Sequence, residues 1–196
     1  GAAANGHGRV ADLLVRRGAE INMQSSKGST ALMCAAQEGH ERMVELLLQR
    51  GAEINMQNSV GGFALMCAAT NGHGRVVDLL LRRGAEINMQ SSKGSTALMC
   101  AAAHGHPAVV LRLLRAGADT ALRSESGRTA LQLARTNGHA ECVEAGKKHV
   151  QEVLPGRPTA TAAGGEGAGG ASSAGARGAK TRSPAGAAGR GARGAA

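Results

Sequence analysis

The chain has 196 residues, 42% of them hydrophobic, and Phe63 is its single aromatic residue. It contains no run approaching about 18 apolar residues, which excludes a membrane-spanning helix. The formal net charge of +9 permits contact with nucleic acid or another anionic surface, but residues 155–196, with six Lys/Arg and one Glu, supply +5 of it.

The first residues read as the rear part of a repeated unit. Residues 2–36 match residues 68–102 at 32 of 35 positions, so residues 1–26 are predicted to form a partial repeat. Val10, Leu13 and Leu14 are then expected on a helix. The chain starts at Gly1 without Met and shows no apolar secretory segment, and we interpret it as a fragment.

Full repeats are predicted at 27–59, 60–92 and 93–125, because the same residue types return every 33 residues. Each unit reads as a turn, a short apolar helix, a Gly-His break, a longer helix and a polar hairpin. The recurring positions include Leu32, Leu65, Leu98, Leu131; Gly39, Gly72, Gly105, Gly138; and Gly18, Gly51, Gly84, Gly117. Such a period predicts a stack of similar units instead of one closed core.

Local signals place the helix ends. Thr30 precedes the first helix of its repeat, where a hydroxyl can cap free backbone N–H groups, and Phe63 takes that place in the second full repeat. Val44 and Leu47 lie on one face of the second helix. Gly51 follows that helix and suits a left-handed C-cap.

Residues 126–154 are predicted to form an altered last repeat. Gly146 and Lys147 occupy the places of Leu47 and Leu48, which suits a C-terminal cap that faces water. Residues 155–196 contain 12 Gly, 14 Ala and no Leu, Val or Ile, so this Arg/Gly-containing tail is expected to be disordered.

The unit resembles the ankyrin repeat over residues 2–154. The motif residues are Gly28-Ser-Thr-Ala-Leu32, Ala35-Ala36, Gly39-His40, Val44, Leu46-Leu47-Leu48 and Gly51-Ala52-Glu53. The resemblance implies an all-α repeat solenoid, with helix-turn-helix units and β-hairpin fingers over residues 1–154. It also implies a concave binding face made of hairpin tips and the exposed side of the first helices.

Cysteine and histidine ladders recur at the repeat spacing. Cys34, Cys67 and Cys100 are expected on stacked helices about 8–10 Å apart, too far for a disulfide or a shared zinc ion. The Gly-His histidines, such as His40, are interpreted as turn structure, and we expect no metal or cofactor. Free thiols favour a reducing compartment and hence an intracellular location, cytoplasmic or nuclear.

Methionines and basic residues form further ladders. Met33, Met66 and Met99 stand where the ankyrin motif has His and are expected to pack in the core. The second-helix ends are basic at Arg16-Arg17, Gln49-Arg50, Arg82-Arg83 and Arg115. We interpret these cations as complements to the negative helix C-terminus, with phosphate contact as the alternative.

The sequence offers no phosphate loop and no nucleophile beside a base, so we predict a non-catalytic protein-interaction scaffold. Phe63 is either an aromatic anchor for a partner or a cover for the core. Two alternatives stay open: RNA or anionic-polymer contact through the tail, and a targeting module of a longer enzyme or signalling protein. The candidate partner-binding residues are those that differ between repeats on the expected face: Ser26, Lys27, Ser29, Gln37, Glu38, Ser59, Val60, Phe63, Thr70, Asn71, Ser92, Lys93, Ser95, Ala103, His104, Glu125, Arg128, Arg135 and Thr136.

Overall fold

A computed structural model of the chain describes Leu13 and residues 17–153. The helices with described bounds lie in one unit, residues 1–159, and a second unit covers residues 160–196. The predicted disorder of residues 155–196 falls outside the described residues, as do the predicted helical positions of Val10 and Leu14. Leu13 is helical, as predicted.

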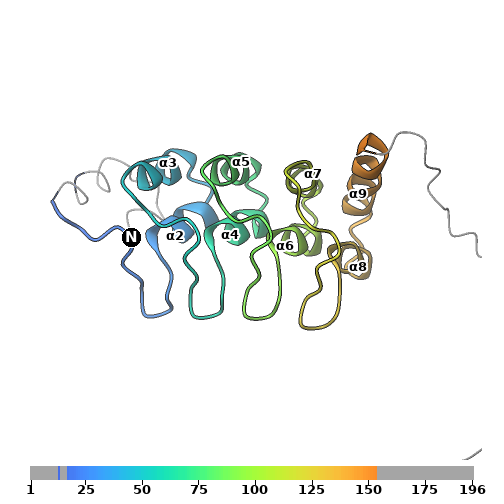
Figure 1. Cartoon of the computed structure of the whole chain (residues 1–196), viewed down its shortest axis with the longest axis horizontal. Helices are drawn as coiled ribbons and strands as arrows, with labels where there is room; N and C mark the ends of the chain where they lie inside the picture. Colours follow the sequence, from blue (N-terminus) through green and yellow to red (C-terminus); the bar gives the residue numbers. More distant parts are fainter. Residues whose placement is uncertain (1–12, 14–16, 154–196) are drawn as a thin grey trace, which may run out of the picture. The chain divides into compact units, whose positions relative to one another are not determined.

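Within residues 17–153 the helices come in pairs, a seven-residue helix followed by a longer one (Figure 1). The longer helix has nine residues in three pairs and 14 in the last. In chain order the helices are α2 (Ala31–Gln37), α3 (Glu41–Gln49), α4 (Ala64–Thr70), α5 (Gly74–Arg82), α6 (Ala97–Ala103), α7 (Pro107–Arg115), α8 (Ala130–Thr136) and α9 (Ala140–Val153). The predicted all-α repeat stack is confirmed.

The pairs stack into two rows. The short helices α2, α4, α6 and α8 each contact the next one in their row, and the longer helices α3, α5, α7 and α9 do the same. Long loops project from the short-helix row on the side away from the longer helices (Figure 1). We call these loops fingers 1 to 4: residues 19–30, 52–63, 85–96 and 118–129. The fingers and the short helices therefore share one side of the stack.

The fingers contain no regular strands: no β-strand is assigned within residues 17–153. In finger 1 the Ser25 N–H donates to the Ser29 carbonyl at 3.0 Å and the Gly28 N–H donates to the Ser25 carbonyl at 2.8 Å. Gly28 has a φ of 74°, a left-handed conformation that glycine adopts without strain. The expected β-hairpins are thus tight turns with short arms.

Helix caps follow the sequence. The Thr30 hydroxyl accepts from the Met33 N–H at 3.3 Å and the Thr96 hydroxyl from the Met99 N–H at 3.2 Å. At the start of α4, Phe63 provides no side-chain cap, as predicted. Pro107 is the first residue of α7, where its missing N–H has no helical partner to lose.

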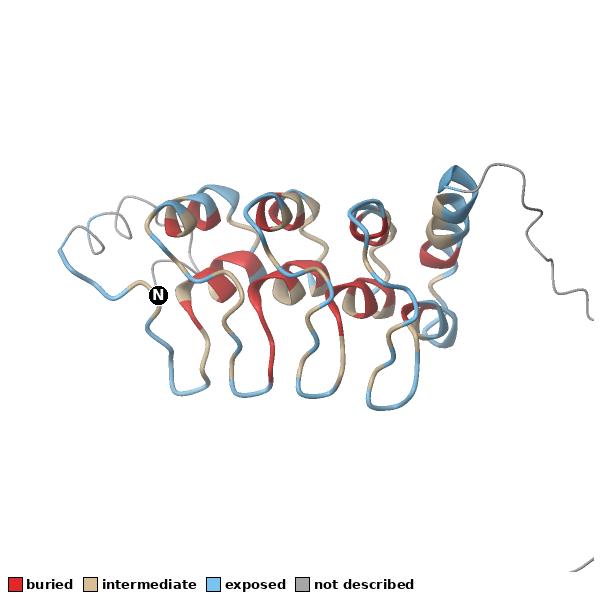
Figure 2. Ribbon diagram, in the orientation of Figure 1, coloured by how far each residue is buried: buried red, intermediate tan, exposed pale blue. Residues whose placement is uncertain are grey.

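The core runs along the stack between the two helix rows (Figure 2). The short helices bury small residues, such as Ala35 and Ala68, which are completely buried. Met33 and Met99 are buried as predicted, and Met66 is half-buried. Small side chains let the short helices pack closely, which explains how a core can form with one aromatic residue.

The last pair contains the two substitutions on which the predicted C-terminal cap is based. Lys147 is exposed, as expected. Gly146 is half-buried and lines a small apolar cavity of about 50 Å³ with Leu98, Val110 and Leu114. Arg135 is exposed and stands at the repeat position where Ala36, Ala69 and Ala102 are buried.

Candidate interaction face

The candidate face consists of the finger tips and the ends of the short helices. The tip residues Lys27, Val60, Lys93 and Ser126 are equivalent positions 33 residues apart, and all four are exposed. We call them the tip row. Their neighbours Ser26, Ser59, Ser92 and Glu125 are exposed too, whereas Ser29 and Ser95 are half-buried. Most of the fingertip residues predicted for binding are therefore accessible.

In fingers 1 to 3 the turn is held by a side chain at its first residue. In fingers 1 and 3 the Ser25 and Ser91 hydroxyls each accept from a backbone N–H four residues later, both at 3.2 Å. In finger 2, Asn58 takes this place, and its Oδ1 accepts from the N–H groups of Val60 at 3.1 Å and Gly62 at 2.7 Å. A β-carbon on Gly62 would lie 3.1 Å from the Asn58 amide. Asn58 and Gly62 therefore form a matched pair that keeps the turn in a different sequence.

Hydrogen bonds join each fingertip to the next. The Lys27 carbonyl accepts from both the N–H and the hydroxyl of Ser59, at 3.1 and 2.9 Å. The Val60 carbonyl accepts from the Ser92 hydroxyl at 2.6 Å, and the Lys93 carbonyl from the Glu125 N–H at 2.8 Å. These bonds use the backbone of the tip residues and leave their side chains exposed.

A second set of bonds joins the finger arms. The Asn22 Oδ1 accepts from the Glu53 N–H at 2.8 Å, and Asn55 and Asn88 repeat the contact with the next finger at 3.0 and 2.8 Å. Gln24 donates to the Gln57 carbonyl at 2.9 Å. The spacing between fingers is thus fixed by the chain itself.

The ends of the short helices supply the rest of the face. Gln37, Glu38, Asn71, His104 and Thr136 are exposed there, and Thr70 and Ala103 are half-buried. Several of these polar groups are already used. The Thr70 hydroxyl donates to the Met66 carbonyl at 2.9 Å, and Nδ1 of His104 lies 2.9 Å from the Cys100 carbonyl.

The Gly-His histidines tie adjacent repeats together. Nε2 of His73 lies 2.8 Å from the Gln37 carbonyl oxygen, Nε2 of His106 2.9 Å from that of Thr70, and Nε2 of His139 3.0 Å from that of Ala103. Because a carbonyl only accepts, the ring nitrogen donates in each case. The structural interpretation of these histidines is confirmed.

Phe63 lies in the core, and it does not present an aromatic anchor on the candidate face. Its side chain is 2% exposed. The position is buried in the neighbouring repeats too, where Thr30 and Thr96 are 3% and 2% exposed. In Figure 2 the arm of finger 2 that leads into α4 is buried. The ring therefore covers the core, the second of the two interpretations offered by the sequence.

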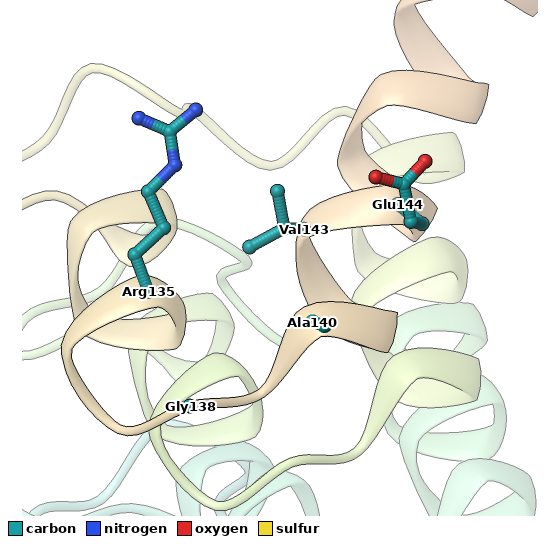
Figure 3. Close-up of a pocket in the computed structure, with 5 residues that line it drawn as sticks. All are labelled: Arg135, Gly138, Ala140, Val143 and Glu144. Atoms are coloured by element: carbon teal, nitrogen blue, oxygen red, sulfur yellow. The ribbon is translucent and has the colours of Figure 1, made fainter.

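Arg135 lies on a different surface from the other candidates. With Gly138, Ala140, Val143 and Glu144 it lines an open pocket between α8 and α9 (Figure 3). By repeat position Arg135 corresponds to Ala36, and the equivalent of Glu38 is Asn137. The Asn137 side chain donates to the Ala103 carbonyl at 2.8 Å. Glu125, Arg128 and Thr136 keep their predicted positions on the finger and short-helix side.

The thiol of Cys67 is unsuited to nucleophilic chemistry. All four cysteines are free; Cys142 is buried, and Cys34, Cys67 and Cys100 are half-buried. Burial raises the pKa of Cys67 to about 11, with smaller contributions from Cys34 and Cys100. The thiolate is the reactive form, so Cys67 is almost wholly protonated near neutral pH. In the described part of the chain no three His, Cys, Asp or Glu side chains cluster as a metal site would require.

The cations of the second helices pair across repeats. Arg83 contacts Glu45 at 3.0 Å, Arg115 contacts Glu152 at 3.1 Å, and Arg112 contacts Asp78. Arg82, Arg112 and Arg115 also lie in the last turns of their helices, where positive charge is favourable. Arg83, Arg112 and Arg115 therefore have acidic partners within the stack.

Comparison with known proteins agrees with this architecture. The family model described as "Ankyrin repeats (3 copies)" matches residues 1–91 and 65–145. None of the curated proteins compared with the chain matches it. Among the helices of residues 17–153, none has the length and apolar character needed to cross a bilayer. Ankyrin repeats are generally protein–protein interaction modules and are typically non-catalytic. Because the match covers more than half of the residues, the chain belongs to the ankyrin-repeat family.

Proposed function

We propose that this chain is a non-catalytic recognition module that binds another protein across its finger tips and short-helix ends. The supporting observation is the set of hydrogen bonds between fingers, which fixes the spacing of the exposed tip row before any partner arrives. A surface ordered in advance loses little conformational entropy on binding. The fingers repeat the same architecture but carry different side chains at their tips, and this combination suits recognition better than catalysis.

Photo-crosslinking from two sides of the stack tests this proposal. A photoreactive residue is placed at Ser26 or His104 on the proposed face, and at Arg42 or Arg82 on the longer helices as matched exposed controls. We expect protein crosslinks from Ser26 and His104 that are absent from Arg42 and Arg82. Crosslinks from the longer helices alone would overturn the proposal.

The sequence of residues 155–196 supports a second candidate function. Its six Lys/Arg oppose one Glu, and Arg-Gly pairs occur at Arg177, Arg190 and Arg193. Such a segment can contact RNA or another polyanion by counterion release. The role of the chain as a module of a longer enzyme or signalling protein is a further proposal, and recovering the complete reading frame tests it directly.

A further inference from the structure

The side chains of the tip row alternate between charged and apolar in a way that the fold does not require. Fingers 1 and 3 have the same sequence over residues 19–30 and 85–96, and both place a lysine at the tip. Finger 2 places Val60 there, with 61% of its surface exposed. The row therefore reads as cation, apolar side chain, cation along three adjacent fingers.

Nothing in the structure of finger 2 calls for valine at this position. The Asn58 and Gly62 pair holds the turn through the backbone, and Gly61 has a φ of 70°, close to the 74° and 67° of Gly28 and Gly94. The glycine that follows the tip residue thus has a similar conformation after lysine and after valine. An exposed apolar side chain without a packing role is a candidate contact for a partner.

The two lysines are available on either side of Val60. Both are exposed, and no ion pair of Lys27 or Lys93 is found within residues 17–153. Their backbone carbonyls are bonded to the next finger, so the base of each side chain is fixed while the amine is accessible. Charge complementarity calls for carboxylates opposite both amines.

We propose that the tip row recognises a protein segment in polyproline II conformation that carries two acidic residues, each three positions from a central apolar residue. This inference rests on the proposed function and names the chemistry of its partner. Neighbouring helix axes lie about 8–10 Å apart, and hydrogen bonds between adjacent fingers keep the finger tips in register with the helices. Polyproline II has three residues per turn and rises about 3.1 Å per residue, so side chains three apart share a face about 9 Å apart.

Other conformations fit this row less well. In a β-strand, side chains three positions apart point to opposite faces. An amphipathic helix is recognised in an apolar groove. The finger tips instead project from the stack as a ridge of exposed loop ends (Figure 2). An extended segment lying across the ridge can meet all three side chains.

Fluorescence anisotropy with the full chain and the peptide Glu-Pro-Pro-Leu-Pro-Pro-Glu tests the proposal. We expect this peptide to bind severalfold and up to about 25-fold more tightly than the same peptide with both Glu replaced by Lys, since two exposed ion pairs contribute up to about fivefold each. The double variant Lys27→Glu/Lys93→Glu should invert the preference. The variant Val60→Lys, which matches fingers 1 and 3, should fold normally and weaken binding severalfold.

A charge-matched control separates recognition from general attraction. Arg42→Glu/Lys148→Glu changes the net charge by the same amount at exposed positions of the longer helices and should leave peptide binding unchanged. Equal weakening by both double variants would overturn the proposal, as would equal binding of the acidic and basic peptides. Tighter binding of a helical peptide with the same residues seven apart would overturn the assigned conformation. None of these results bears on the crosslinking test, which uses no assumption about partner charge.

Discussion

His106 closes the joint between two repeats: its Nε2 lies 2.9 Å from the carbonyl oxygen of Thr70 at the end of α4. The ring also covers Gly72, where an added β-carbon would lie 2.7 Å from Nδ1 of the ring. Gly72 has a φ of 76°, so the turn and the histidine require glycine for two separate reasons. The hydrogen bond to Thr70 and the close contact of the ring with Gly72 together fix the position of one repeat on the next.

Replacing His106 by alanine should therefore destabilise the stack. The change removes the bond between repeats and leaves the Thr70 carbonyl without this donor, for a loss of about 1–3 kcal/mol in the free energy of unfolding. Chemical denaturation measures it. His104→Ala is the matched control, because the exposed His104 ring bonds only within its own helix region, to the Cys100 carbonyl. A loss of stability no larger than that of the control would contradict this role of His106 between the repeats.

Phe63→Thr should lower stability even though it restores the cap residue of the neighbouring repeats. Removing a buried aromatic side chain costs about 3–5 kcal/mol, and a new threonine cap returns about 1 kcal/mol. Thermal unfolding should thus show a clear decrease in Tm. Phe63→Leu, which keeps most of the volume, should lose less. An unchanged Tm for Phe63→Thr would show that the ring does not hold the core.

The helix pairs could be predicted because the 33-residue period and the local caps agree. The burial of Phe63 could not be predicted in this way. Phe63 occupies the repeat position of the cap residue Thr30, and a residue at a helix cap is often exposed. The length of α9 did have a signal in the sequence. Val150 stands where Gly51, Gly84 and Gly117 end the other helices, so α9 continues to Val153.

The contacts between repeats could not be read from the sequence. Asn22 and Glu53 lie 31 residues apart, and their recurrence is equally typical of a solvated surface. His73 bonds a carbonyl 36 residues earlier, a pairing that depends on how the repeats stack. Spacing along the chain identifies equivalent positions, but only the packing shows which of them touch.

Deleting residues 155–196 tests the anionic-polymer alternative. If the tail binds RNA, the affinity of the full chain for poly(U) should fall steeply with salt, because phosphate contacts release counterions. The deletion should abolish this binding and leave the thermal unfolding of the repeats unchanged. Filter binding at several salt concentrations measures the slope. Poly(U) binding that survives the deletion would place the contact on the repeats.

Cys67 should react slowly with thiol reagents near neutral pH. Its pKa is raised by burial to about 11 from an ordinary value of 9.0, so the labelling rate should keep increasing up to about pH 11. Since the folded-state pKa exceeds the unfolded one, its contribution to stability is complete below about pH 9 and is lost as the pH rises through 11. Mass spectrometry of alkylated peptides follows Cys67 individually. A rate that levels off near pH 9 in the folded chain would contradict the shift.

Gly146→Leu should stabilise the last repeat. The equivalent residues Leu47, Leu80 and Leu113 are 3%, 0% and 0% exposed, whereas Gly146 leaves an apolar cavity of about 50 Å³. A β-carbon built there meets no atom within 4 Å, so the side chain can enter without a backbone clash.

The gain in stability expected from replacing Gly146 has two contributions, which can be separated. Gly146→Ala should gain about 1 kcal/mol from helix propensity alone, and leucine should add the burial of further apolar surface in the cavity. Denaturation of the two variants beside the parent measures both steps. Leucine less stable than alanine would mean that the cavity is too small for the longer side chain.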